Sequence, residues 1–241
     1  MKHAYFGRTV IEGVSLEVSA GEIVALVGPS GCGKSTLAHI AAGILDPTAG
    51  HIERGYNRHG MVFQEVRLLP WATARANIAY PLRFLDLTKQ QRRDRIAAAA
   101  ERASLSNQDL EKYPSELSGG MKQRVAIARA VAVAPDFVYL DEPFTALDAA
   151  LRRRMQDLVI DAARSFRFGA LFISHDLVEA FRVAHRVAVM DAAGRGILGE
   201  RTIPGEPGAR EDADLFALVS TSLKEDPLFR HVNDIDERRT P

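Results

Sequence analysis

Cysteine is almost missing from this chain of 241 residues, because Cys32 is its only one. A single cysteine cannot form an intramolecular disulfide, which excludes the small disulfide-stabilised folds and fits a reducing compartment. Long apolar runs are missing too: no stretch of about 18 apolar residues is present that could cross a membrane. The first ten residues lack the apolar core of a signal peptide. For any work at a membrane, we therefore expect other chains to bring this one there.

An excess of charge of either sign is also lacking. Lys and Arg together number 31, as do Asp and Glu, so the formal net charge is zero. A general electrostatic affinity for nucleic acid is therefore not indicated, and we predict no nucleic-acid partner. The length is that of one substantial domain or of a domain with an insertion.

Short apolar runs between turn signals are the clearest structural pattern. Rich in branched residues, they are typical of buried parallel strands, and helical patterns separate them, which predicts an α/β fold with a mostly parallel sheet. No buried strand is evident between about residues 66 and 134, where the pattern is helical. We therefore expect a single domain over 1–241 with an inserted helical subdomain at about 66–134, a hairpin after Met190 and a C-terminal helix and tail at about 200–241. The predicted strands are 23–27 (IVALV), 137–140 (FVYL), 170–173 (ALFI) and 186–190 (RVAVM).

A glycine-rich motif, GPSGCGKST, follows the first of these strands and opens a helical segment. Its spacing, a glycine, four residues and then Gly-Lys-Ser, is typical of a phosphate-binding loop, and its flanks argue against a chance glycine turn. Backbone N–H groups of such a loop wrap a phosphate at a helix N-terminus. Lys34 is expected to reach the terminal phosphates and Ser35 to coordinate Mg²⁺, while Cys32 fills space. The predicted nucleotide-binding residues are Gly28, Pro29, Ser30, Gly31, Cys32, Gly33, Lys34, Ser35 and Thr36.

Two adjacent carboxylates end the apolar run FVYL. Asp141 is placed to hold the shell of a Mg²⁺ ion, and Glu142, one residue further, to orient or deprotonate a water in line with the γ-phosphate. The alternative is a strand end that merely meets solvent, which is less favoured beside a phosphate loop.

Three further candidates are weak when taken singly. His175 follows the predicted strand ALFI, and parallel strands bring their carboxyl ends to one crevice, so it is a candidate for contact with the γ-phosphate. Gln64 follows a short apolar run, and its amide is suited to ligating Mg²⁺ or positioning water. Tyr5 is a candidate for stacking on a base, with Phe6 as its competitor and ordinary packing as the alternative.

The segment ELSGGMKQR, from Glu116 to Arg124, contains no group capable of chemistry by itself, yet it holds two adjacent glycines. Taken in order, GPSGCGKST, Gln64, LSGGMKQR, VYLDEP, ALD at 146–148 and the pair at 174–175 resemble the ATP-binding subunit of ABC transporters. The resemblance covers the chain from about Tyr5 to about Leu198. It implies a P-loop NTPase core with a mostly parallel sheet, an antiparallel β-subdomain and an inserted helical subdomain.

The resemblance also implies roles for residues that chemistry alone leaves unexplained. Ser118, Gly119, Gly120 and Met121 would contact ATP held by the phosphate loop of a second copy, so that two nucleotides bridge a head-to-tail, twofold dimer. Asp148 would link the two sites across the dimer. Tyr5 would stack on the base, and Lys34, Gln64, Glu142 and His175 would act in hydrolysis, with Ser35, Gln64 and Asp141 around Mg²⁺.

Within the family, MVFQEVRLLPWATARANIAYPL and FTALDAALRRRMQ resemble importer subunits of the nitrate, sulfonate and taurine group. Such a resemblance implies integral membrane permease partners, a solute-binding protein outside the membrane and a peripheral location on the cytoplasmic face of a bacterial inner membrane. Two departures stand out. Few residues precede Tyr5, where an opening strand is usual, which leaves three alternatives: a trimmed start, a misassigned start, or a β-subdomain that lacks an edge strand. His185 stands where the family usually has Asp.

Two other functions remain open from the sequence. A soluble ABC-type ATPase without a transport role would carry the same nucleotide motifs, although the segment LLPW and the absence of a second ATPase core count against it. A phosphate-loop kinase that transfers to a small acceptor would not account for LSGGMKQR.

Overall fold

The structure is a computed structural model, and it describes residues 1–145, 147–230 and 232. Ala146, of the predicted ALD segment, and the predicted polar tail from residue 233 onward lie outside the described residues. The chain divides into two compact units. The first comprises residues 1–55 and 170–241, and the second comprises residues 56–169.

The first unit is built on four neighbouring strands in the order β6, β3, β7 and β8. The strands β6 (Gly169–Ile173), β3 (Ile23–Val27) and β7 (Arg186–Met190) pair in parallel, and β8 (Ile197–Thr202) is antiparallel to β7. Every residue of β3 and β6 is buried, which is the result expected for parallel strands covered on both faces.

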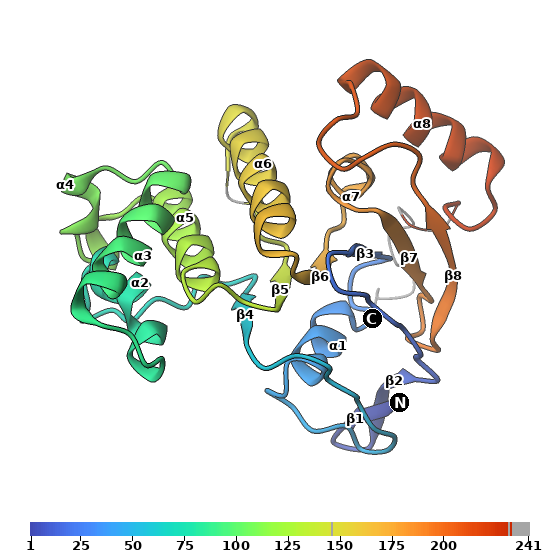
Figure 1. Ribbon diagram of the computed structural model, residues 1–241. Coiled ribbons are helices and arrows are strands. Elements are labelled where there is room, and N and C mark those ends of the chain that lie inside the picture. Colours follow the sequence, from blue (N-terminus) through green and yellow to red (C-terminus); the bar gives the residue numbers. More distant parts are fainter. Residues whose placement is uncertain (146, 231, 233–241) are drawn as a thin grey trace. The chain divides into compact units, whose positions relative to one another are not determined.

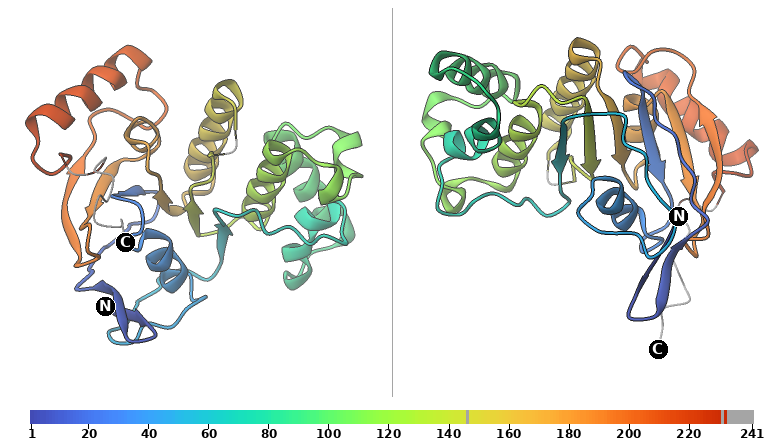
Figure 2. Two further views of the ribbon diagram at one scale, coloured as in Figure 1. Left: turned by 180° about the vertical axis from the view of Figure 1, so that it is seen from behind. Right: turned by 60° about the horizontal axis from the view of Figure 1, so that its bottom comes forward.

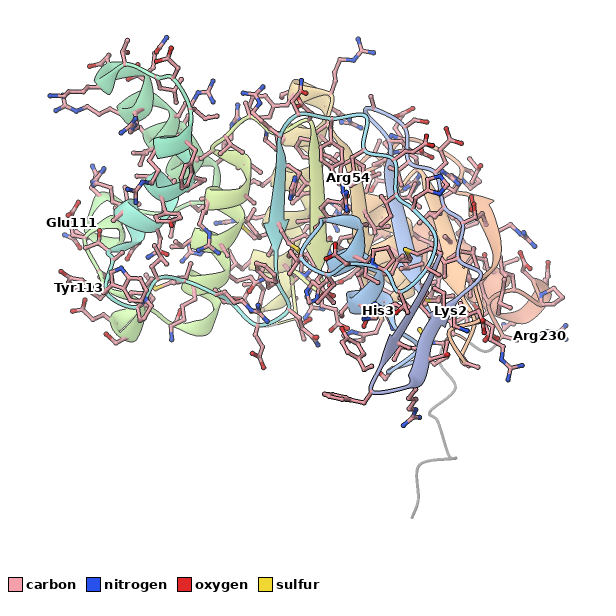
Figure 3. The ribbon with its side chains drawn as sticks, turned by 90° about the horizontal axis from the view of Figure 1, so that it is seen from below. Lys2, His3, Arg54, Glu111, Tyr113 and Arg230 are labelled. Atoms are coloured by element: carbon pink, nitrogen blue, oxygen red, sulfur yellow. The ribbon has the colours of Figure 1, made fainter. Side chains whose placement is uncertain are left out.

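Three helices belong to the same unit: α1 (Lys34–Ala41), α7 (Leu177–Val183) and α8 (Asp212–Glu225). The helix α7 packs on β3 and β7 and also against α8, which is drawn in red in Figure 1. Arg54, labelled in Figure 3, donates from Nε to the carbonyl of Ala41 (2.7 Å) and from Nη2 to that of Ile40 (2.9 Å). These bonds satisfy carbonyl groups at the C-terminal end of α1, which have no partner within the helix.

A separate hairpin is formed by β1 (Lys2–Tyr5) and β2 (Arg8–Glu12), which pair antiparallel. In the right-hand view of Figure 2 it extends as a ribbon of its own, away from the four strands of this unit. Phe6 (φ 50°) and Gly7 (φ 80°) make its turn, and positive φ at both positions gives the twist that suits a two-residue hairpin. The alternative that the β-subdomain lacks an edge strand was therefore wrong, because Lys2–Tyr5 form β1.

The second unit holds one strand pair and most of the helices. The parallel strands are β4 (His59–Val62) and β5 (Phe137–Asp141). The helix α5 packs on β4 and against α2 and α3. The helical segments of the unit are α2 (Ala74–Ala79), η1 (Tyr80–Phe84), α3 (Lys89–Arg102), α4 (Asn107–Leu110), η2 (Pro114–Glu116), α5 (Gly119–Val131) and α6 (Ala149–Phe166).

All four predicted strands are present, the hairpin after Met190 is β7–β8, and the C-terminal helix is α8. The sequence pattern missed β4, because HGMV is short and contains a glycine and a histidine, which dilute the β signal. Gly60 is nevertheless required there: a Cβ on it would lie 2.6 Å from the carbonyl oxygen of Ala130 in α5. Among the described residues, no helix is long and apolar enough to cross a membrane.

Candidate active site

The loop between β3 and α1 and the first turn of α1 carry the predicted phosphate-binding residues, from Gly28 to Thr36. Three of its glycines have positive φ: Gly28 (153°), Gly31 (80°) and Gly33 (103°). Side chains would strain this backbone, and a Cβ on Gly28 would also lie 2.9 Å from the carbonyl oxygen of Met190. The glycines therefore permit the tight loop that the motif predicts, and the helix that follows begins at Lys34.

Lys34, the first residue of α1, is buried, with 6% of its surface exposed. Its Nζ donates to the carbonyl oxygens of Gly28 (2.8 Å) and Pro29 (2.9 Å). No carboxylate of the described part of the chain pairs with this ammonium group. A buried cation held by two carbonyl oxygens and a thiol sulfur, with no carboxylate, is costly, so an anion is a fitting further partner for it. The donor set at the N-terminus of α1 is suited to a phosphate.

Cys32 lies in the same loop and is also buried. Burial raises the pKa of its thiol, and Lys34 Nζ lies 3.9 Å from its Sγ. A thiol with a raised pKa is poor in thiolate and is therefore a weak nucleophile. The structure thus agrees with a space-filling role.

Successive contacts connect the phosphate-binding loop with Tyr5. A Cβ on Gly33 would lie 3.1 Å from Ile11 Cγ1, so β2 covers the loop closely. Ile11 pairs across the hairpin with His3, and the rings of His3 and Tyr5 meet edge to face at a centroid distance of 4.7 Å. Tyr5 keeps 40% of its surface exposed, whereas Phe6 stands fully exposed at the turn. Both rings are accessible, and base stacking by Tyr5 stays a prediction.

His175 follows β6 within the same unit. Leu26 of β3 pairs with Ile173 of β6, so the two parallel strands end at the same edge, where the phosphate loop begins and where His175 is exposed. The neighbouring Ser174 is buried and donates to Glu179 Oε2 (2.9 Å), which fixes the turn into α7. The structure therefore brings the loop and His175 to one edge of the sheet, as the strand order predicts.

The second unit gathers three more candidates at the end of its strand pair. Asp141 closes β5 and is 1% exposed, and Glu142 follows it with φ 46°. Val62 of β4 pairs with Leu140, so the exposed Gln64 leaves its strand at the same edge. No cluster of three or more His, Cys, Asp or Glu side chains suited to a metal occurs among the described residues. Carboxylate, hydroxyl and amide oxygens nevertheless suit Mg²⁺, which keeps much of its water shell and needs few protein ligands.

The predicted signature segment surrounds the start of α5. Ser118 is the N-cap: its Oγ accepts a hydrogen bond from the N–H of Met121 at 3.3 Å. A Cβ on Gly119 would meet nothing within 4 Å. The absence of a side chain at Gly119 therefore has no explanation in the packing of the chain itself.

Asp148 is the N-cap of α6, and its Oδ1 accepts from the N–H of Leu151 at 2.9 Å. This local role accounts for an aspartate at this position, since N-caps favour Asp. Communication across a dimer stays a prediction. Two residues near the site were missed by the sequence analysis: His3, which is buried against Tyr5, and Thr145, whose hydroxyl contacts Glu142.

Comparison with known proteins decides the family. The family model described as "ABC transporter" matches residues 11–145, which is more than half of the chain. The chain belongs to the ABC transporter family. The α/β fold with a mostly parallel sheet and a separate antiparallel hairpin is thereby confirmed as an ABC ATPase fold.

Relatives within the ABC family extend the match to nearly the whole chain. An aliphatic sulfonates import ATP-binding protein of Pseudomonas aeruginosa (strain UCBPP-PA14) is 39% identical over 239 residues, covering 93% of this chain and 94% of the relative. The corresponding protein of Pseudomonas syringae pv. syringae (strain B728a) is 40% identical over 223 residues, covering 92% of each.

A solved structure of a dimeric bacterial ABC transporter cassette has a TM-score of 0.78 and 29% identity, covering 85% of this chain and 97% of that one. A second structure of that cassette, in a post-hydrolysis state bound to ADP and phosphate, has a TM-score of 0.75 and 28% identity. These similarities, together with the family, support ATP binding and ATPase activity for this chain.

Proposed function

We propose that this chain binds and hydrolyses ATP to drive an importer of aliphatic sulfonates or of a related small solute such as taurine or nitrate. The observation that carries the proposal is the similarity to sulfonate-import ATP-binding proteins over nine-tenths of both chains. The buried, carboxylate-free Lys34 in a glycine loop supplies the matching chemistry at the site.

In this proposal the β- and γ-phosphates of ATP are further partners of Lys34, whose ammonium group neutralises part of their charge. The Ser35 hydroxyl, the Asp141 carboxylate and the Gln64 amide would hold Mg²⁺. When bound, the metal ion neutralises charge on the β- and γ-phosphates. Glu142 accepts a proton from the attacking water or orients it, and His175 contacts the γ-phosphate.

A second copy of the chain completes each site. Ser118, Gly119, Gly120 and Met121, at the N-terminus of α5, face the γ-phosphate held by the other copy's loop. The open space beside Gly119 and the N–H groups of the first turn of α5 suit an anion there. ATP binding then closes the dimer, and hydrolysis reopens it. Asp148 would link the two sites across the dimer.

The remaining partners follow from the proposed transport role. Two copies dock on integral membrane permease subunits at the cytoplasmic face of the inner membrane, and a solute-binding protein delivers the solute from outside. The exposed Trp71 (75%) belongs to the segment expected near the permease. A soluble, non-transport ABC ATPase is the alternative, and the sulfonate-import relatives do not favour it.

The solute is tested in the host by deleting the coding sequence and supplying ethanesulfonate or sulfate as the sole sulfur source. We expect the deletion strain to grow on sulfate but not on ethanesulfonate. Expression of the wild-type chain should restore growth on ethanesulfonate, and expression of Glu142→Gln should not. Unimpaired uptake of labelled ethanesulfonate and taurine by the deletion strain would contradict the proposed solute class. In the purified chain, Glu142→Gln is expected to keep ATP binding, accumulate an ATP-bound dimer and nearly abolish phosphate release.

A further inference from the structure

Glu142 has an unusual backbone for its residue type. Its φ of 46° places it in the left-handed region immediately after β5 ends at Asp141. A residue with a side chain is disfavoured in this conformation, and glutamate gains nothing there from its own short-range bonding, unlike Asn or Asp. Strained residues persist where the surrounding structure holds them, and they cluster at functional sites. The relevant question is which contacts hold Glu142.

Thr145 supplies two contacts. Its Oγ1 lies 3.2 Å from the carbonyl oxygen of Glu142 and 3.4 Å from Glu142 Oε2. The hydroxyl has one proton to donate, so the two oxygens share it in a three-centre bond or take it in turn. One side chain thus contacts both the backbone and the carboxylate of Glu142.

The segment that carries Thr145 is itself anchored. Phe144 is fully buried, and its carbonyl accepts from the N–H of Leu147 at 3.1 Å. Asp148 then caps α6. The threonine side chain is β-branched, so its χ1 angle is stiff and the hydroxyl is held in a defined direction. Thr145 is exposed, so burial of its methyl group does not account for the residue.

We propose that Thr145 is a positioning residue for Glu142. Its hydroxyl stabilises the left-handed backbone through the carbonyl and restricts the carboxylate through Oε2, so that the carboxylate is aimed before water arrives. This inference rests on the proposed role of Glu142 in hydrolysis. A purely local turn would need only the carbonyl contact; the second contact, to Oε2, is the observation that extends the role to catalysis.

Two variants of the full-length chain separate the hydroxyl from the shape of the side chain. Thr145→Val keeps the branched shape and removes the hydroxyl, and Thr145→Ser keeps the hydroxyl. We expect kcat for ATP hydrolysis to fall on the order of tenfold in Thr145→Val, because small misplacements of a catalytic group are costly. The KM for ATP should stay unchanged, and Thr145→Ser should retain at least about half of the wild-type kcat. A merely structural role would instead lower the melting temperature and move kcat and KM together.

A double mutant tests whether Thr145 acts through the Glu142 carboxylate. In a Glu142→Gln background there is no carboxylate to aim, so adding Thr145→Val should change the residual turnover by less than about twofold. Wild-type kcat in Thr145→Val, or an equal tenfold loss in both backgrounds, would overturn the inference while leaving the role of Glu142 intact. Full turnover in Glu142→Gln alone would overturn both that role and the inference. Should Thr145→Val fail to fold, Thr145→Ala measured against Thr145→Ser gives the same comparison.

Discussion

The backbone N–H of Ile23 donates a hydrogen bond to Nδ1 of His185, 3.0 Å away, and the N–H of His185 returns one to the carbonyl of Ile23 at 2.8 Å. The pair extends the β3–β7 ladder by one position. The imidazole of His185 therefore supplies the hydrogen-bond acceptor at this position. By resemblance to the family, an aspartate is expected at this position. His185 lacks the negative charge of an aspartate but still provides a hydrogen-bond acceptor for the N–H of Ile23.

Replacing His185 tests this reading of the substitution. His185→Leu leaves the buried N–H of Ile23 without an acceptor, which should cost about 1–3 kcal/mol of unfolding free energy. His185→Asp supplies a carboxylate acceptor and should cost less than His185→Leu. Urea unfolding of the three proteins measures the difference, and equal losses in Asp and Leu variants would show that the acceptor is not what the position requires.

Gly60 offers a test of the close packing between β4 and α5. Gly60→Ala brings a Cβ to 2.6 Å from the carbonyl oxygen of Ala130, which is backbone and yields little. We expect a loss of about 1–3 kcal/mol, the usual cost of overpacking. Gly55→Ala is the matched control, since a Cβ there meets nothing within 4 Å. Urea unfolding should separate the two variants, and a Gly60→Ala protein as stable as the control would contradict the packing argument.

The free energy of unfolding at acid pH should depend on the protonation of Asp109. Hydrogen bonds from Lys112 and then from Ser106 lower the pKa of its carboxyl from 3.8 to about 2. A lowered carboxyl pKa stabilises the folded state above the unfolded value, and that contribution is lost as the pH falls through the folded value. The wild type should therefore exceed Asp109→Asn in stability at pH 6, with the difference vanishing between about pH 4 and pH 2.

The control for this titration is Asp86→Asn, because Asp86 is exposed and makes no hydrogen bond or ion pair among the described residues. Denaturant unfolding is repeated at each pH for the three proteins. A difference between wild type and Asp109→Asn that persists unchanged to pH 2 would refute the assignment.

How far the sequence predicts the site depends on the range of the interactions involved. The strands IVALV and FVYL are continuous apolar runs, so their burial and the loops at their ends can be predicted directly. The hairpin of β1 and β2 was missed, because KHAY and RTVIE are short and mix polar and apolar residues, although the turn at Phe6 and Gly7 joins them into a paired hairpin.

Two features could not have been predicted from composition or spacing. The contact of Thr145 with Glu142 depends on the left-handed backbone of Glu142, and a motif does not encode a φ angle. The acceptor role of His185 depends on β3, 162 residues earlier in the chain. The roles of Thr145 and His185 each depend on the geometry of individual hydrogen bonds. The strands could be predicted because that prediction depends only on the hydrophobicity of several residues taken together.

The start of α5 provides the sharpest test of the proposed composite site. Because a Cβ on Gly119 meets nothing within 4 Å, Gly119→Ala should fold normally and even gain stability, since Ala is favoured over Gly in a helix by up to about 1 kcal/mol. If nucleotide held by a second copy approaches this glycine, the added methyl group should still reduce ATP hydrolysis, by roughly 100-fold. Loss of activity without loss of stability is the signature expected only for contact from outside the chain.

A second substitution addresses the same contact through Ser118. Ser118→Arg should leave ATP binding to the monomer largely intact while blocking dimer closure and hydrolysis. It also removes the N-cap that Ser118 supplies to Met121, at a cost of about 1 kcal/mol, and Thr73→Ala, which removes the cap of α2, controls for that loss. ATP-induced dimerisation by size-exclusion chromatography and phosphate release are measured on all variants. Cooperative hydrolysis at the wild-type rate in both Gly119→Ala and Ser118→Arg would mean that this helix terminus does not complete an active site.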